Sequence, residues 1–244
     1  MSRHRPTPSW RERVPGRKPE QYFNWRGKEV SRLENLADAV FGFALTLLVV
    51  STEVPRDFDS LLKVFRDFPA FAACFGILLL FWNDHYKFFR RYGLEDFFTR
   101  SLNYAILLLV LFSVYPLKFL FSAWLGSGRG IGSVEQLMQL YRIYGLGFAV
   151  IWLLYGLLQF HALRQAERLR LTPVEIVLTR LQLNEFHLQI TVCLLSVALT
   201  YLPVPPWLPG AIYGLIGPLA GWNGWRHGRQ VTALLARDAA TRPA

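Results

Sequence analysis

Residues 32–50 read RLENLADAVFGFALTLLVV, with an arginine at the start and one aspartate, Asp38, six residues later. From Ala39 to Val50 the stretch is apolar apart from Thr46. A carboxylate at the mouth of an apolar helix is costly in lipid, and it persists where it meets protein, water or a substrate path. We therefore expect this helix to face other protein or a pore rather than lipid alone.

The composition is that of an integral membrane protein. The 244 residues are 52% hydrophobic and 15% aromatic, with a mean hydropathy of +0.24. The formal net charge is +10, but the charges lie between apolar segments and at the ends. We therefore assign them to membrane topology and not to nucleic-acid binding. Cys74 and Cys193 both lie in apolar runs, which argues against a disulfide framework and a thiol metal site.

Six segments approach the ~20 apolar residues that cross a hydrocarbon core of ~30 Å. They predict an all-α integral membrane fold with six transmembrane helices inside residues 32–226. Residues 1–31 are basic and proline-rich, which predicts a disordered cytoplasmic tail, and residues 227–244 are expected to form a cytoplasmic C-terminal tail. The predicted spans are 33–52, 68–89, 97–122, 137–162, 183–202 and 207–226.

The arrangement of lysine and arginine predicts the orientation of the chain. With six spans, 21 of the 27 basic residues fall on the side that holds both termini. The other side receives Arg56, Lys63, Arg66, Lys118, Arg129 and Arg142. The positive-inside rule therefore places both termini in the cytoplasm of a multi-pass protein of the inner (plasma) membrane.

Several polar residues are expected at one depth, near the cytoplasmic ends of the spans. Asp38, His85 and Asn103 lead this group, and they predict a hydrogen-bonded ring that fixes the first helix against its neighbours. The other members of the group are Asn184, His187, Trp222 and Asn223. The alternative is that these residues simply meet water and headgroups at the interface.

No two histidines have an i, i+4 spacing, so we expect no metal site. We find no catalytic set, and we expect a protein that is not an enzyme.

One face of the first helix carries a stripe of residues at spacings of three or four. It contains a hydroxyl at Thr46 between bulky apolar residues. The stripe fits an ordinary core helix of a bundle. It also fits a pore wall repeated around a symmetry axis, in which apolar rings gate by dewetting and a hydroxyl ring replaces part of an ion's hydration. The stripe consists of Ala39, Phe43, Thr46, Leu47 and Val50.

Arg32 with Leu36-Ala37-Asp38 resembles the Arg-x-x-x-Phe-Ser-Asp signature that opens the first helix of the endosomal/lysosomal transmembrane potassium channels and their bacterial homologues. The segment Phe81–Phe89 is similar to that family's Trp-x-x-His segment, and Tyr141–Arg164 fits its fourth helix. The third-helix pattern is represented by Asp96, Asn103 and Tyr115-Pro116. The resemblance covers residues 30–165, and the rest matches by length and span count.

This resemblance implies a bacterial-type homotetramer in a lipid bilayer, with the first helix of each six-helix subunit lining a central pore. Residues 32–226 would then be a channel domain that conducts potassium, the permeant monovalent cation, without a cofactor. By position, Phe43 would form the hydrophobic constriction, Thr46 the selectivity level, and Leu47 and Val50 further pore layers.

The chain departs from the family pattern at four positions. Leu36 and Ala37 stand where the motif has phenylalanine and serine, and Phe43 stands where a smaller aliphatic residue is usual. Ser51 stands where the family usually has an acidic residue just beyond the first helix. A non-conducting or transporter-like membrane protein of the same fold is therefore the alternative to a passive cation channel.

Overall fold

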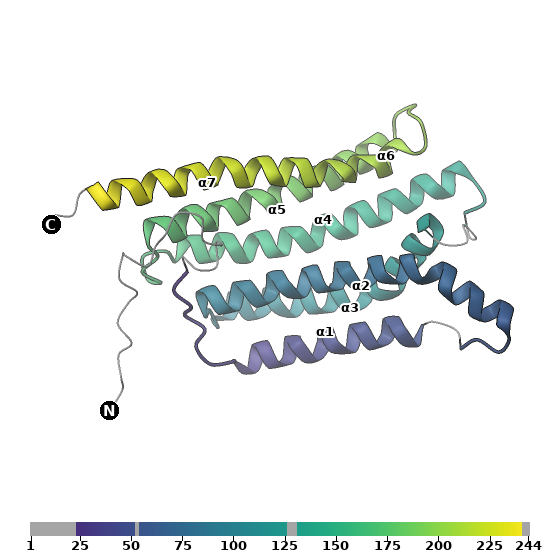
Figure 1. Ribbon diagram of the computed structural model, residues 1–244, viewed down its shortest axis with the longest axis horizontal. Helices are drawn as coiled ribbons and strands as arrows, with labels where there is room; N and C mark the ends of the chain where they lie inside the picture. Colours follow the sequence, from purple (N-terminus) through teal and green to yellow (C-terminus); the bar gives the residue numbers. More distant parts are fainter. Residues whose placement is uncertain (1–22, 52–53, 126–130, 241–244) are drawn as a thin grey trace.

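The computed structural model describes residues 23–51, 54–125 and 131–240, and every regular element in these ranges is helical. Figure 1 shows a bundle of long helices that run up and down beside one another. The elements are α1 (Arg32–Val50), α2 (Phe58–Tyr92), α3 (Phe97–Leu125), α4 (Val134–Arg164), α5 (Pro173–Leu199), α6 (Leu208–Ala211), a 3₁₀ turn (Ile212–Leu215) and α7 (Ile216–Ala240).

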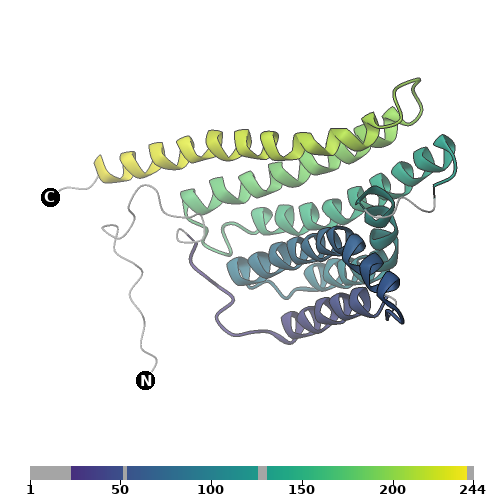
Figure 2. The same ribbon diagram turned by 45° about the vertical axis from the view of Figure 1, so that its right-hand side comes forward.

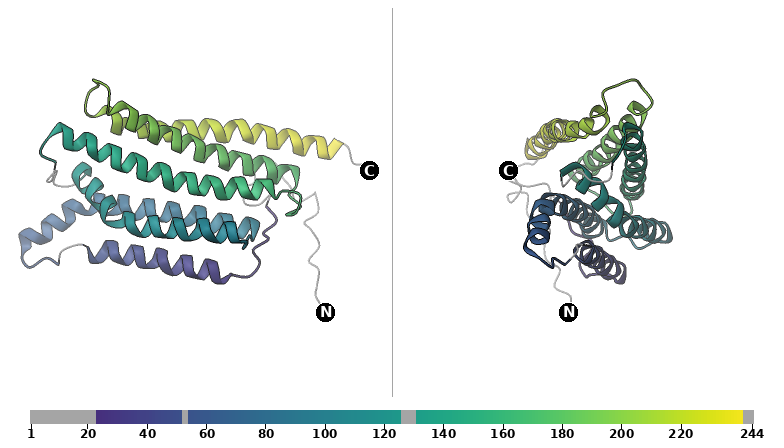
Figure 3. Two further views of the ribbon diagram at one scale, coloured as in Figure 1. Left: turned by 180° about the vertical axis from the view of Figure 1, so that it is seen from behind. Right: turned by 90° about the vertical axis from the view of Figure 1, so that its right-hand side faces the viewer.

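Helix α1 lies at one edge of the subunit. It packs against α2 and α3, whereas α4 pairs with α5, and α7 packs on α5 at the opposite edge. The end-on view in Figure 3 shows α1 at the rim, far from α7. The start of α1 and the end of α7 lie at the same end of the bundle, and α7 extends beyond the other helices there (Figure 2).

Local sequence explains where the helices begin and end. Capping boxes start α1 at Ser31, α2 at Asp57 and α5 at Thr172. In each box the cap side chain accepts from the backbone amide three residues later, and the side chain of that later residue accepts from the backbone amide of the cap. Helix α2 ends at Gly93, whose φ of 58° is left-handed and suits glycine. Pro69 lies inside α2 and cannot donate the usual backbone bond, and Figure 1 shows α2 bent near its start.

The helical fold agrees with the sequence, but several limits differ from those predicted. Within the described residues, four helices, α1 to α4, are long and apolar enough to cross a membrane. Helix α2 begins at residue 58 rather than 68, and α5 at 173 rather than 183. The predicted span 207–226 is divided between α6, the 3₁₀ turn and α7, and α7 continues past the predicted tail boundary to Ala240. The six-span count remains a prediction.

The segment 23–31 is packed, which differs from the disordered tail predicted up to residue 31. Phe23 is buried against the ring of Tyr92, with centroids 5.9 Å apart, and beneath the guanidinium of Arg91. The backbone of Gly27 exchanges hydrogen bonds with Arg90. A Cβ at Gly27 would lie 2.6 Å from the carbonyl oxygen of Phe89, so this close approach requires glycine. Residues 1–22 of the predicted tail, and 241–244, lie outside the described residues.

Arg26 fixes this segment to the start of α5. Its guanidinium donates to both carboxylate oxygens of Glu175, each at 3.0 Å, and its Nε donates to the carbonyl of Leu169 at 2.7 Å. The side chain of Glu175 is fully buried and also accepts from the amides of Asn24 and Thr172. The chain that leads into α1 is therefore held against the opposite half of the bundle.

Candidate functional site

The two faces of α1 have different surroundings. One face packs against α2 and α3 and buries Leu33, Ala37, Phe41, Ala44 and Leu48. The opposite face is left uncovered by the rest of the subunit. Phe43 is 56% exposed and Val50 is 73% exposed. The α1 stripe, defined by Ala39, Phe43, Thr46 and Val50 with the partly buried Leu47 at its margin, therefore lies on the uncovered face.

The hydroxyl of Thr46 has a defined orientation. It donates to the carbonyl of Gly42, one turn earlier, at 2.7 Å. A hydroxyl has one proton and two lone pairs, so this bond uses the proton and leaves the oxygen able to accept. The exposed Thr46 oxygen is therefore an acceptor on the uncovered face of α1.

Asp38 has a different partner from those expected for it. Its carboxylate accepts a hydrogen bond from the indole Nε1 of Trp82 on α2 at 2.8 Å. Asp38 and Arg32 are both exposed. The sequence predicted a hydrogen-bonded ring of Asp38 with His85 and Asn103, and Trp82, although part of the Trp-x-x-His segment, was not identified as a partner of Asp38.

His85 of α2 and Asn103 of α3 meet in the core, next to the first turns of α1. The ring Nε2 of His85 lies 2.7 Å from Oδ1 of Asn103, and both residues are buried. The imidazole also lies against Phe41 of α1, with ring centroids 5.9 Å apart, and it is close enough to Asp38 for the two to interact electrostatically. The structure thus brings Asp38, His85 and Asn103 to one level, with Arg32 one to two turns before them on α1.

The C-terminal end of α1 is fixed by a lysine that the sequence did not identify. The Nζ of Lys118 on α3 donates to the backbone carbonyl of Ser51 and, at 3.0 Å, to its hydroxyl. A cation at a helix C-terminus satisfies end carbonyls and complements the helix dipole. Lys118 therefore holds the last turn of α1 against α3.

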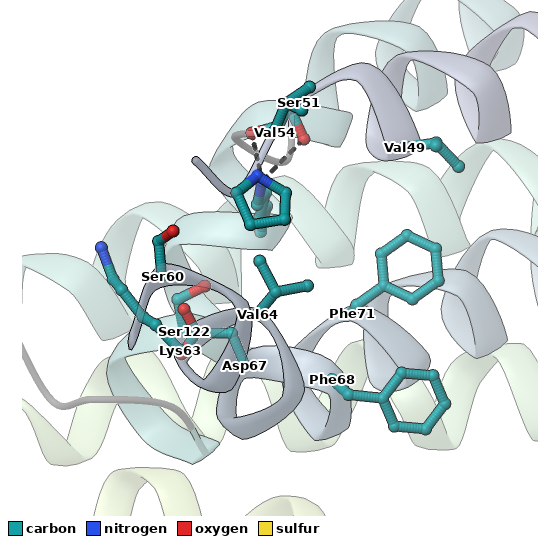
Figure 4. A pocket seen from close by; sticks show the side chains of 12 residues that line it. Val49, Ser51, Val54, Ser60, Lys63, Val64, Asp67, Phe68, Phe71 and Ser122 are labelled. Atoms are coloured by element: carbon teal, nitrogen blue, oxygen red, sulfur yellow. Dashed lines mark hydrogen bonds between the residues drawn. The ribbon is translucent and has the colours of Figure 1, made fainter. Parts of the chain in front are cut away.

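A cavity of about 490 Å³ opens beside this contact. Figure 4 shows it between the end of α1 and the first turns of α2, with Phe68 and Phe71 on one side and Ser60 and Lys63 on the other. Oδ1 of Asp67 in its wall is buried without a hydrogen-bond partner among the described residues. The C-terminal end of α1 is thus bordered by both charged and aromatic side chains.

A second polar contact closes the other end of the bundle. Asp96, just before α3, accepts from the amide of Thr99 at 2.9 Å and from Gln165 at 3.0 Å, and lies 2.8 Å from Nε2 of His161. Partial burial raises the pKa of the Asp96 carboxyl, but the bonds from His161, Thr99 and Gln165 outweigh it and lower that pKa well below its ordinary value. The carboxylate therefore joins the start of α3 to the end of α4.

We expect Asp96→Asn to weaken the loss of protein stability that accompanies a fall in pH below neutrality. A carboxyl with a lowered pKa in the folded state stabilises the protein above the unfolded pKa of about 3.9, and this contribution is lost as the pH falls from there toward the folded pKa. Melting temperatures measured from pH 7 to pH 3 should fall less steeply for Asp96→Asn than for the unchanged protein. Asp59→Asn, at an exposed aspartate on α2, is the matched control. Equal slopes for Asp96→Asn and the unchanged protein would contradict this role.

Comparisons with known proteins agree with this arrangement. The family profile of the endosomal/lysosomal potassium channel TMEM175 matches residues 32–116, which contain α1, α2 and most of α3. A potassium channel from Marivirga tractuosa is 36% identical over 228 residues, or 85% of this chain and 91% of that protein. A potassium channel from Chamaesiphon minutus is 31% identical over 100 residues, which cover 38% of this chain and 49% of that protein.

Solved structures show the same fold. A variant of the potassium channel MtTMEM175, crystallised with a nanobody fusion protein, superposes with a TM-score of 0.72 at 32% identity, over 90% of this chain and 97% of that one. A TMEM175 homologue from Chamaesiphon minutus superposes with a TM-score of 0.56 at 23% identity, over 80% and 96% of the two chains. These likenesses point to an ion-channel family rather than to an enzyme family. The chain belongs to the family of the endosomal/lysosomal potassium channel TMEM175.

Proposed function

We propose that the chain is a passive, potassium-preferring cation channel that assembles as a homotetramer with α1 around a central pore. The observation that carries this proposal is the α1 stripe, which the subunit itself leaves uncovered. The preference for potassium rests on the relatives, which are described as potassium channels.

The polarity of the uncovered face favours a pore over a lipid contact. Asn35, Asp38 and Thr46 are all exposed on α1. Polar groups at membrane depth are costly against lipid and are found facing protein or water. Packing of four subunits through α1 would give these groups such surroundings, and it would also cover the exposed apolar side chains of Phe43 and Val50.

The stripe defines an order of layers along such a pore. Phe43 would form the narrow apolar constriction, with Thr46 one turn further out and Leu47 and Val50 in flanking layers. Because the Thr46 proton is bonded to Gly42, its oxygen can offer a lone pair to a cation, as a hydroxyl ring must. Arg32, Asp38, His85 and Asn103 would support the inner end of α1 and not contact the ion.

The deciding experiment measures flux through the purified full-length protein in liposomes. Parallel gradients of potassium, sodium and protons should produce passive flux that is fastest for potassium. A tetramer by native mass spectrometry is expected in the same preparation. Absence of downhill flux from a correctly assembled protein would favour the non-conducting alternative, whereas flux that requires a second, coupled ion would favour the transporter-like one.

We expect Thr46→Val to lower the potassium-over-sodium ratio several-fold while conduction persists. Valine keeps the shape of threonine but removes the hydroxyl oxygen that would meet the ion. The measurement is the ratio of liposome fluxes in matched potassium and sodium gradients. Thr191→Val is the matched control, since the exposed Thr191 on α5 also donates to the carbonyl four residues earlier, at 2.8 Å. An unchanged ratio in Thr46→Val would remove Thr46 from the selectivity level.

We expect both termini to face the cytoplasm of the inner (plasma) membrane. The unequal distribution of basic residues carries this expectation, and α1 begins at the same end at which α7 ends. A cysteine added after Ala244 should resist an impermeant thiol reagent applied to intact cells. Val54→Cys, at an 83% exposed position between α1 and α2, should react. The reverse labelling pattern would invert the topology.

A further inference from the structure

A partly open cavity of about 390 Å³ lies between the helices of the subunit, away from the proposed pore. Its wall is formed by α2, α3, α4 and α5 together with α6, the 3₁₀ turn and the start of α7. None of the described residues that line it belongs to α1. Its volume is within the range of roughly 300–1,000 Å³ that holds small organic ligands. This cavity is therefore a candidate binding site that is independent of ion conduction.

Two residues in this wall present hydrogen-bond acceptors without a donor. Asp84 of α2 lines the cavity, and within the described part of the chain no hydrogen bond reaches its carboxylate. Oε1 of Gln189 on α5 also belongs to this wall, and it is buried without a partner among the described residues. A buried acceptor without a donor, as at Gln189, is costly, whereas the Asp84 side chain is partly exposed. The missing complement is a group that carries several N–H donors.

The charges near Asp84 come from α2 and α5. Lys87 and Arg91 follow it on α2 and act on it electrostatically, while Glu185 of α5 adds a second negative charge. The two cations follow Asp84 on its own helix without forming an ion pair with it among the described contacts. The carboxylate thus remains free to receive a cationic donor from the cavity side.

Aromatic rings form much of the remaining wall. Phe81, one turn before Asp84 on α2, lies 5.1 Å from the ring of Trp152 and 6.3 Å from that of Phe148, centroid to centroid. Tyr144 continues the cluster at 6.4 Å from Phe148. Aromatic faces attract cations as well as apolar groups. The wall therefore suits a molecule with a positive head and a hydrophobic body.

We propose that this cavity binds a hydrophobic primary ammonium cation. The ammonium group donates to the carboxylate of Asp84 and to Oε1 of Gln189, and the apolar body lies among Phe81, Phe148 and Trp152. An uncharged occupant, such as a lipid acyl chain, would fill the aromatic part but leave both acceptors without donors.

The first test compares two ligands with one skeleton. 4-Phenylbutan-1-amine is protonated at pH 7, whereas 4-phenylbutan-1-ol is neutral. Binding of each to the purified full-length protein in a non-ionic detergent is measured by equilibrium dialysis. The amine should bind at least about tenfold more tightly than the alcohol. Asp84→Asn should abolish this preference, and the exposed control Asp59→Asn should retain it. Equal binding of the two ligands, or an unchanged preference in Asp84→Asn, would overturn the proposal.

A second test needs no substitution and therefore does not depend on the folding of a variant. Cys193 lines the cavity, whereas Cys74, the other free and buried cysteine, is absent from its wall. The amine should slow the reaction of Cys193 with N-ethylmaleimide relative to Cys74, as followed by peptide mass spectrometry. Protection by the alcohol to the same degree would indicate an apolar lipid site, and protection by neither ligand would indicate that the cavity does not bind the amine. Neither measurement involves ion flux, so its failure leaves the channel proposal unaffected.

Discussion

Replacing Phe43 with alanine is expected to raise passive cation flux several-fold, with potassium preference unchanged or reduced. In the proposed pore, four phenylalanine rings form an apolar constriction that excludes water, and their removal would allow the passage to hydrate. The folding of the subunit should change little, because the Phe43 side chain is 56% exposed and contributes little to the core. Liposome flux and melting temperature of the same preparation measure both effects.

Phe41→Ala provides the matched control two residues away on the same helix. Phe41 is 2% exposed and lies against His85 on the packed face of α1. Its truncation should cost roughly 3–5 kcal/mol of unfolding free energy through a core cavity, without a gain in flux per folded channel. If Phe43→Ala instead destabilises the protein as Phe41→Ala does and flux stays constant, α1 is a core helix and the pore proposal fails.

The sequence predicted the helices most accurately where apolar residues were continuous. The limits of α1 and α3 lie within three residues of those predicted, since the apolar runs there end at a cap or a loop. The start of α2 was missed because Asp57 and Ser60 cap a polar first stretch that hydropathy does not register. The end of α7 was missed for the same reason, since the helix continues through polar sequence after residue 226.

The α1 stripe could be predicted from the sequence, because residues share a face of an α-helix according to its repeat of 3.6 residues per turn. Its exposure, in contrast, depends on which neighbours cover the other face, and only the structure shows that α2 and α3 do so. The Asp38–Trp82 and Lys118–Ser51 contacts join different helices. Such pairings depend on helix rotation and crossing, which local sequence patterns do not specify.

Arg26→Ala is expected to produce the largest loss of stability among the polar substitutions. The change leaves the fully buried carboxylate of Glu175 without its cation, and loss of one partner of a buried ion pair costs about 3–5 kcal/mol. The carbonyl of Leu169 also loses its donor. The melting temperature in detergent should fall by about 10 °C, at roughly 2–4 °C per kcal/mol for a chain of this size. Lys28→Ala, at an exposed position two residues away, should have little effect.

A double-mutant cycle separates the ion pair from simple loss of contacts. Glu175→Gln removes the charge that Arg26 compensates, and its single oxygen can still accept from one of the two amides, Asn24 or Thr172, that donate to different oxygens of the carboxylate. The double variant Arg26→Ala/Glu175→Gln should therefore be more stable than Arg26→Ala alone, because no buried carboxylate remains unpaired. Additive losses would show instead that Arg26 acts through its backbone contacts. Because residues 23–31 lead directly into α1, either result measures how firmly the proposed pore helix is anchored to α5.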